Sequence, residues 1–531
     1  MTNGMTTRAA ILAFTAVVTT PGAVLAAEAG PGALRIGWAS TSITPEGPVV
    51  MSGGRRARIS TGIMDPITVT ALVLESVGKD GKTAELVAQV SIDLSSLRED
   101  VMRFILAKMA ERVPEIKPSE LIVYATHTHA APDSRPAPAL AAKLKTLGIE
   151  VPAAWSWWGI DLGVKPTPRD YAEFVAERVV DAVEQALKNR KPGGVSFGLG
   201  HAVVGHNRLI VYDDGRAKMY GKTNRADFNH VEGYEDHSVG LLYTYDADGE
   251  LTGVVINLAC SSQVTEGKRR ISADFWHETR VELHKRLGES LYILPQLAAA
   301  GDQSPHLLVD RRAEERMQKI TGHNLRQQIA VRIADAVTSV LPYMKDHIET
   351  NPLLAHRVEQ VELTRLRVTE EELDKARRDF DRLLAQYMKM RQEIEAEPER
   401  KQKAGWQNRI TPVFWDLRRA YRVLAPHERQ QRTVSVPVHV VRIGEMAMAT
   451  NPFELYLDFG MQIKARSKAV QTFTVELANG CYGYLPTKRS VAGGAYGAIP
   501  ASNEVGPEGG RELVERTLEL IASLWAEKLA R

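Results

Sequence analysis

Apolar and polar residues recur along the chain with spacings that predict strands and helices in turn. Runs rich in β-branched residues predict strands at 33–44, 67–77, 84–95, 120–129 and 195–204. Residues 98–113 and 169–190 instead repeat their apolar side chains with helical spacing. Residues 237–260 predict two strands joined at a turn of Asp-Ala-Asp-Gly. We therefore expect an α/β fold, a mixed sheet with helices on its faces.

A long helical segment interrupts this alternation. Thr369 and Glu372 have the spacing of a capping box. An apolar stripe follows on one helical face: Leu373, Ala376, Phe380, Leu383 and Tyr387. The strand pattern returns at Val434, and a helix is expected near the end of the chain. We expect one large domain over 34–525, with a helical-hairpin insertion at 369–424 whose stripe serves packing.

The first 26 residues have the three parts of a secretory signal. Arg8 supplies the charge, residues 9–18 are apolar, and Val24 and Ala26 are small residues before a cut. The apolar run is too short to span a bilayer, and no later run is longer. We expect cleavage near Ala26 and an exported protein, periplasmic or secreted, with no transmembrane segment.

Composition excludes some partners. A net charge of +2, from 67 basic and 65 acidic residues, gives no electrostatic case for nucleic acid or a membrane surface. The two cysteines, Cys260 and Cys481, do not make a disulfide framework. Three roles stay open for them: a disulfide, metal ligands or buried thiols. Buried thiols are favoured. The oligomeric state stays open.

The stretch "ATHTHAAPD" follows an apolar strand and carries His127 and His129. In extended backbone, residues two apart point to the same side, so the two imidazoles share one metal or one substrate. Ligands gather at the carboxyl ends of strands in α/β proteins. A structural role for the pair is the alternative.

Two other strand ends carry polar residues. Ser304, with His306 close by, follows a small-residue run after a strand, where ordinary turn chemistry is the alternative to an exposed hydroxyl near a metal. Glu454 has two interpretations. It is the third residue of a helix capped by Asn451 with Pro452 at its first position, or it is a metal ligand.

Three weaker signals remain. Ser272 is expected to cap a helix that starts at residue 273, which places Asp274 and His277 on one face of its first turn. These two are surface and capping groups, or a second acid and imidazole near the site. The loop 477–498 is rich in glycine and tyrosine. The aromatic stretch 151–165 lines a substrate cleft or covers the core.

Taken in order, these motifs resemble the neutral (non-lysosomal) ceramidase family. The motifs are "THTH" with Ala-Ala-Pro, "NLAC", "GDQSP", Pro-x-Glu and Asn-Gly-x-x-Gly-Tyr, and the resemblance extends over about residues 34–525. It implies a zinc-dependent amidase that hydrolyses the N-acyl bond of ceramide. It also implies three metal ligands, His127, Glu454 and Tyr484. His129 would contact the substrate or the oxyanion, and Ser304 would lie beside the zinc-bound water or the scissile amide. Tyr496 matches a second active-site tyrosine.

The sequence departs from this family at one zinc ligand. Ser261 stands where the family has a second zinc-binding histidine, so Asp274, His277 or Cys260 replaces it or the metal is lost. Asp274 or His277 would then carry a proton to the leaving group. No segment resembles the family's C-terminal β-sandwich.

The resulting prediction is an exported zinc-dependent hydrolase that cleaves an N-acyl amide of a small molecule or lipid, such as ceramide. The alternatives are a hydrolase of esters or glycosides and a metal-free binding protein.

Overall fold

The computed structural model describes residues 1, 33–135, 138–150, 157–403 and 405–526. The predicted signal peptide, apart from Met1, lies outside these residues. An eight-stranded sheet holds, in spatial order, β14 (Tyr292–Leu297), β13 (Leu251–Leu258), β12 (Ser238–Asp246), β7 (Lys191–His201), β1 (Leu34–Ser42), β4 (Thr68–Val77), β5 (Thr83–Ile92) and β6 (Leu121–Ala125). The pairs β13–β14 and β5–β6 are parallel and the others antiparallel. The sheet is therefore mixed, as predicted.

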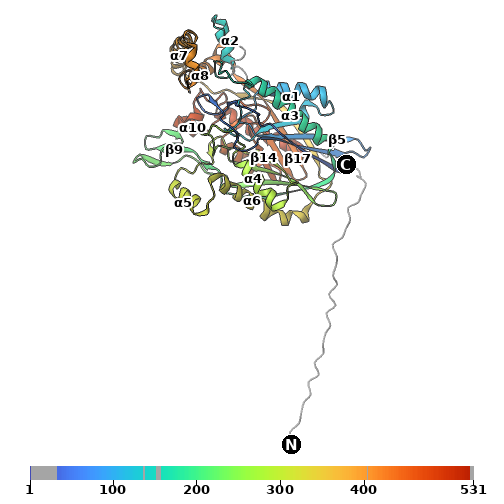
Figure 1. The fold of residues 1–531 in the computed structure, drawn as a ribbon. Helices are drawn as coiled ribbons and strands as arrows, with labels where there is room; N and C mark the ends of the chain where they lie inside the picture. The colour runs from blue at the N-terminus through green and yellow to red at the C-terminus, as the bar shows by residue number, and fades with distance from the viewer. Residues whose placement is uncertain (2–32, 136–137, 151–156, 404, 527–531) are drawn as a thin grey trace.

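The two halves of this sheet diverge in the middle, because β1 and β7 pair only at Arg35 with Pro192 and Ile36 with Lys191. Helices α1 (Glu99–Arg112) and α3 (Pro168–Lys188) cover the outer face of the first half. Helices α4 (Phe275–Leu287) and α6 (Leu325–Met344) cover that of the second half. Figure 1 shows the two helix pairs on opposite sides of the strands.

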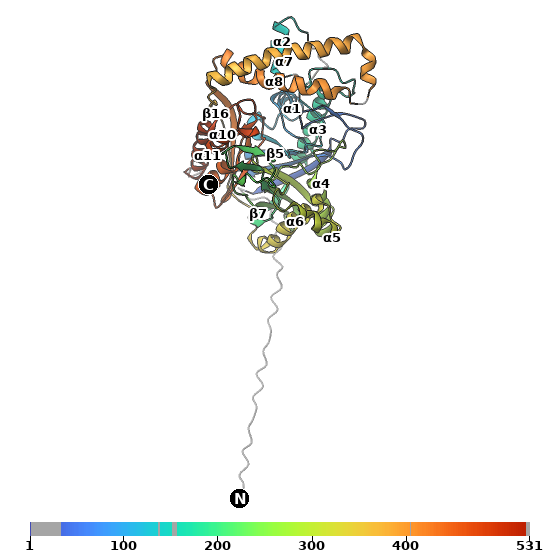
Figure 2. The same cartoon turned by 90° about the vertical axis from the view of Figure 1, so that its left-hand side faces the viewer.

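The inner faces of both halves pack against a second sheet. Its strands are β16 (Leu354–Thr364), β17 (Thr433–Ile443), β18 (Met446–Thr450) and β20 (Gln471–Val475). Trp38, Tyr124, Leu294 and Phe473 are buried together in this central core. Helices α9 (Leu457–Arg466) and α11 (Pro507–Ala526) cover the far side of the second sheet. Figure 2 shows α11 and β16 on the side of the molecule away from α4 and α6.

A helical hairpin lies over one end of these layers. Helices α7 (Glu370–Ala396) and α8 (Gln407–Glu428) pack side by side, close to α2 (Ala139–Thr146), as Figures 1 and 2 show. Thr369 and Glu372 form the predicted capping box, and the predicted apolar stripe of α7 is buried. It packs against Ile410, Phe414 and Leu417 of α8. The predicted α/β fold with a helical hairpin is confirmed.

Short elements connect these layers. They are β2 (Val50–Met51), β3 (Arg58–Ile59), β8 (His206–Asn207), β9 (Leu209–Tyr212), β10 (Ala217–Met219), β11 (Phe228–Val231), β15 (Gln303–Ser304), β19 (Glu454–Leu455), β21 (Tyr484–Leu485), α5 (Arg311–Thr321) and α10 (Lys488–Gly493). Single turns of 3₁₀-helix lie at Pro118–Glu120, Lys345–His347, Pro398–Gln402 and Tyr496–Ala498. The predicted hairpin of residues 237–260 is formed by β12 and β13.

Two helix starts were predicted wrongly. The helix expected from Asn451 begins only at Leu457, because residues 454–455 pair with β21 as a strand instead. The helix expected from residue 273 begins at Phe275. Its N-cap is Asp274, whose side chain accepts the Phe275 N–H, while the Ser272 hydroxyl accepts the Asp274 N–H.

The described residues bear on two expectations, one about a transmembrane segment and one about a disulfide. No helix within the described residues is long and apolar enough to cross a membrane. Cys260 and Cys481 are both free thiols, so the disulfide that the sequence left open is not formed. Burial raises the pKa of the Cys260 thiol.

Candidate active site

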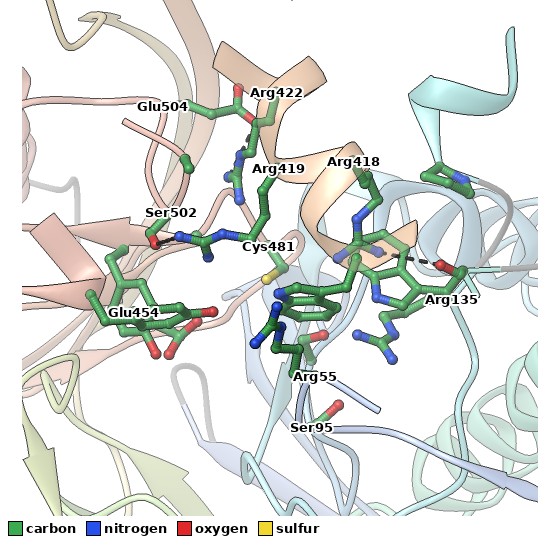
Figure 3. Close-up of a pocket in the computed structure, with 18 of the residues that line it drawn as sticks. Arg55, Ser95, Arg135, Arg418, Arg419, Arg422, Glu454, Cys481, Ser502 and Glu504 are labelled. Carbon is green, nitrogen blue, oxygen red and sulfur yellow. Dashed lines mark hydrogen bonds and ion pairs between the residues drawn. The ribbon is translucent and has the colours of Figure 1, made fainter. Parts of the chain in front are cut away.

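One cavity of about 580 Å³ brings together several of the predicted site residues. They reach it from separate parts of the chain: His127, His129, Glu454, Tyr484 and Tyr496. The loop after β6 carries the two histidines, β19 and β21 carry Glu454 and Tyr484, and the turn at 496–498 carries Tyr496. Figure 3 shows the pocket with Glu454 on its wall.

His127 is a neutral imidazole with a fixed tautomer. Its Nδ1 lies 2.5 Å from the carbonyl oxygen of Ser95, which can only accept, so Nδ1 carries the proton. Burial lowers the pKa of His127 to about 4. The lone pair on Nε2 therefore remains available, 3.5 Å from Oε2 of Glu454. A basic, oriented nitrogen beside a carboxylate suits a metal ligand or a proton acceptor.

His129 converges on His127 but has different partners. The two Nε2 atoms are 3.3 Å apart and the rings meet edge to face. The backbone at His127 has φ 61°, so the segment is not extended as the sequence analysis assumed, although the rings still converge. Nδ1 of His129 lies 3.2 Å from Glu266, and its Nε2 lies 3.1 Å from the side-chain nitrogen of Gln263. His129 is thereby held at both ring nitrogens.

Glu454 and Tyr484 are neighbours because their two short strands run parallel. β19 and β21 place them directly opposite one another in register. Burial raises the pKa of Tyr484 well above its usual value, and the negative charge of Glu454 adds to this, so the phenol is protonated. The Tyr484 ring packs edge-on against Tyr456 and Tyr496. Glu454 is thus a carboxylate with an imidazole on one side and a phenol on the other.

Two cavity residues were missed by the sequence analysis. Arg208 is 2% exposed and donates to Oε1 of Gln263 at 3.1 Å and to the carbonyl of Gly301 at 2.8 Å. Its guanidinium lies 5.9 Å from the ring centre of Tyr484. Gln263 in turn connects Arg208 to His129. Neither residue belongs to a motif, and nothing in the sequence separates Arg208 from the other basic residues.

Three predicted catalytic residues do not line this cavity. Ser304 is fully buried in β15, where its hydroxyl accepts the N–H of His306. Asp274 is fully buried too, and it accepts hydrogen bonds from Thr265 at 2.7 Å and 2.5 Å as well as from Phe275. These bonds hold a loop and leave no free carboxylate for proton transfer. His277 lies on the first turn of α4, outside the cavity lining.

The aromatic stretch contributes directly to the cavity. Trp157 lines it, while Trp158 is buried behind with its ring N–H donating to Asp133. Residues 151–156 lie outside the described part of the chain. Cys481 also lines the cavity, so its half-buried thiol faces the same space as the two histidines. For Trp157, the substrate-cleft interpretation of this stretch agrees with its position.

Two of the three predicted zinc ligands, His127 and Glu454, have the spacing of donors to one metal ion. Ligands of a tetrahedral zinc, with bonds of about 2.0–2.1 Å, lie about 3.3 Å apart. The 3.5 Å between His127 Nε2 and Glu454 Oε2 is close to that spacing, and Tyr484 adjoins Glu454. Within the described residues, no group of three or more His, Cys, Asp and Glu side chains is placed to hold a metal. The candidate donors are therefore the imidazole of His127, the carboxylate of Glu454 and the phenol of Tyr484. Ser261 does not supply a further His, Cys, Asp or Glu donor.

Structures of known proteins share this architecture. The described chain has a ceramidase-like fold. It aligns with the neutral ceramidase from Pseudomonas aeruginosa at a TM-score of 0.64 and 17% identity, over 94% of this chain and 76% of that one. A second structure, a ceramidase complexed with C2, aligns at 0.63 and 16% identity, over 94% and 77%. No protein-family model and no curated protein sequence matches the chain. The fold that the motif order implied is thus supported by structure.

Proposed function

We propose that this protein is a zinc-dependent hydrolase that cleaves an N-acyl amide in the cavity around His127 and Glu454. The observation that carries the proposal is the neutral His127 imidazole, whose Nε2 lone pair faces the Glu454 carboxylate at 3.5 Å inside a cavity of about 580 Å³. The structural neighbours are ceramidases, which supports an amide with an acyl chain as the substrate class.

His127, Glu454 and Tyr484 would hold the zinc. Zinc bound there would polarise the scissile carbonyl and lower the pKa of a bound water toward neutrality. The Ser95 carbonyl keeps the proton of His127 on Nδ1, so that Nε2 presents a lone pair.

Fixed positive charge lies next to these groups. Arg208 is held by Gln263, Gly301 and the hydroxyl of Tyr220, so its guanidinium cannot turn away during a reaction. Such a preorganised donor stabilises negative charge that develops on a carbonyl oxygen, by roughly 3–4 kcal/mol when well placed. Tyr496 and His129 face the same cavity and supply further polar contacts for a substrate.

One observation favours a second candidate, a metal-free binding protein. Arg208 places a buried cation beside Tyr484 and Glu454, and a cation there opposes a second positive charge. In that case the same cavity would bind its ligand without cleaving it.

Metal analysis and hydrolysis assays separate the two candidates. The purified protein is expected to hold about one zinc per chain and to hydrolyse at least one N-acyl amide in a panel of lipid and amino-acid amides. His127→Ala is expected to lose both the metal and the activity, whereas His277→Ala, outside the cavity, keeps both. Zinc-free protein that stays inactive when zinc is added would overturn the hydrolase and favour the binding protein.

Export is part of the same proposal. The pattern of residues 1–26 supports a cleaved signal, so N-terminal sequencing of protein from the periplasm or medium is expected to begin near residue 27. An intact N-terminus in the cytoplasmic fraction would contradict it.

A further inference from the structure

The wall of the cavity beyond the histidines is rich in arginine. Nine of its lining residues are arginines: Arg55, Arg98, Arg135, Arg208, Arg365, Arg418, Arg419, Arg422 and Arg429. Only three are glutamates, Glu266, Glu454 and Glu504, and no aspartate or lysine is among the described residues that line it. The cavity therefore carries an excess of positive charge, although the whole chain is almost neutral at +2.

Part of this charge is already paired. Arg135 forms two hydrogen bonds with Asp133, at 2.7 Å and 2.8 Å. Arg365 and Arg422 share Glu504, at 3.1 Å and 3.4 Å. Arg55 pairs with Asp416. These arginines have their counter-charges within the protein.

The other five, Arg98, Arg208, Arg418, Arg419 and Arg429, form no ion pair with a carboxylate among the described residues. Three of these, Arg98, Arg418 and Arg419, are called the arginine cluster below. Arg98 donates to the Cys481 carbonyl at 2.9 Å, but its buried Nε has no hydrogen-bond partner among the described residues. Arg419 donates to the Ser502 hydroxyl at 3.0 Å. Figure 3 shows Arg418 and Arg419 extending from one helix into the pocket that Glu454 lines.

Aromatic rings hold the cluster in place. The Arg418 guanidinium lies between Trp157 and Trp415, 3.4 Å and 4.5 Å from their ring centres. Arg98 lies over the same Trp157 ring at 4.8 Å. Arg419 lies over Tyr496 at 4.6 Å. Stacking of this kind fixes the plane of a guanidinium. Arg418 also donates one N–H to the Trp157 carbonyl at 3.4 Å. A guanidinium has five N–H groups, so further ones can donate to a ligand.

The crowding of like charges costs free energy that an anion would recover. Burial lowers the pKa of Arg418 well below its usual value, and the charges of Arg135, Arg98 and Arg422 add to this. Guanidinium groups bind carboxylate, sulfonate and phosphate through paired, charge-assisted hydrogen bonds. The charges of Asp133 and Asp416 oppose this crowding in part, but a neutral ligand would leave the cluster without an ion-paired counter-charge.

We propose that the arginine cluster binds an anionic group of the substrate, so that the molecule cleaved is an amide with an acidic head group and not a neutral lipid amide. This proposal rests on the proposed hydrolase for its reaction, but the anion site itself does not depend on cleavage. The cluster and the histidines line the same cavity. Arg419 contacts Tyr496, which packs against Tyr484 beside Glu454, so the anion lies one or two side chains from the reacting bond.

Hydrolysis of matched amides is the first test. The panel has one acyl chain, dodecanoyl, on three anionic amines (glycine, taurine and O-phosphoethanolamine) and on two neutral ones (glycinamide and ethanolamine). The wild-type protein is expected to prefer at least one anionic amide over its neutral partner by about 100-fold in kcat/KM, and the preferred member identifies the anion. Equal rates for the acidic and neutral members would overturn the proposal.

Variants locate the site. Arg418→Gln and Arg419→Gln are each expected to lower the ratio of anionic to neutral kcat/KM by at least about tenfold, mainly through the KM of the anionic amide. Arg377→Gln removes an exposed arginine from the other arm of the hairpin and is the matched control for net charge. If both cavity variants keep the wild-type preference, the cluster is not the anion site.

A binding experiment tests the anion site without catalysis. Calorimetric titration of the His127→Ala protein with N-dodecanoylglycine and N-dodecanoylglycinamide is expected to show at least about tenfold tighter binding of the acid. The difference should disappear when Arg418→Gln or Arg419→Gln is added. If no amide is hydrolysed but the acid still binds selectively, the hydrolase proposal fails and the anion site stands. If hydrolysis occurs but neither assay discriminates, the anion site fails alone.

Discussion

Acid is expected to destabilise the protein through a pair of stacked imidazoles. His356 on β16 and His439 on β17 lie 3.1 Å apart between Nε2 and Nδ1. The side-chain oxygen of Asn479 accepts the N–H of Val123 on β6, so its NH₂ group donates to Nε2 of His439 at 2.9 Å. His439 must then donate from Nδ1 to His356, which leaves both rings neutral. The pair thus connects the second sheet to β6, the strand that precedes His127.

The magnitude follows from the two pKa values. Burial lowers the pKa of His356 to about 4 and that of His439 to about 3, and the charge of His356 adds to the latter shift. In the unfolded chain the pKa of each imidazole is about 6.5. At a pH between the folded and unfolded pKa values, the unfolded state therefore binds more protons. Stability is therefore present above about pH 6.5 and falls as the pH drops. The loss is about 2 kcal/mol per imidazole, or about 4 kcal/mol for the pair, between pH 7.5 and pH 5.

Urea unfolding followed by tryptophan fluorescence at pH 7.5, 6.5, 5.5 and 5.0 measures this loss. The double variant His356→Gln with His439→Gln should lose about 4 kcal/mol less than wild type over the same range, whatever its stability at pH 7.5. His323→Gln, which removes an exposed imidazole, is the matched control and keeps the wild-type pH dependence. The reasoning is refuted if the double variant and wild type lose the same free energy to within about 1 kcal/mol.

Two further substitutions probe the support of the candidate site. A Cβ at Gly301 would lie 2.3 Å from the carbonyl oxygen of Glu454, so Gly301→Ala should displace β19. We expect kcat/KM to fall at least about tenfold while selective anion binding is kept. Unchanged kinetics would contradict this. Glu476 is fully buried, its pKa is raised by burial, and one oxygen accepts the N–H groups of Ala300 and Leu455 at 3.0 Å and 2.8 Å. Glu476→Gln keeps that acceptor and should cost under about 1 kcal/mol, whereas Glu476→Ala should cost about 2–5 kcal/mol in thermal unfolding; equal losses would show that these bonds do not matter.

Local patterns in the sequence determined much of the fold. The α7 stripe and the Thr369–Glu372 capping box predicted that helix because each depends on residues three or four apart. The strands were predicted from runs of β-branched residues. Helix starts at 451 and 273 were wrong because distant chain segments decide them. The backbone of Glu454 bonds to the carbonyl of Gly483, and Asp274 binds Thr265.

For the candidate site, the sequence alone determined five short motifs, and the family resemblance carried by their order implied His127, Glu454, Tyr484 and Tyr496. Only the tertiary structure brought those side chains into one cavity and left Ser304, Asp274 and His277 outside it. The arginine cluster has no sequence signal, since the arginines of α8 look like an ordinary charged helix face. They become a site because Trp157 and the loop that holds Cys481 fold against them from far along the chain. Burial and the pairing of charges are properties of the packed molecule, and no local pattern contains them.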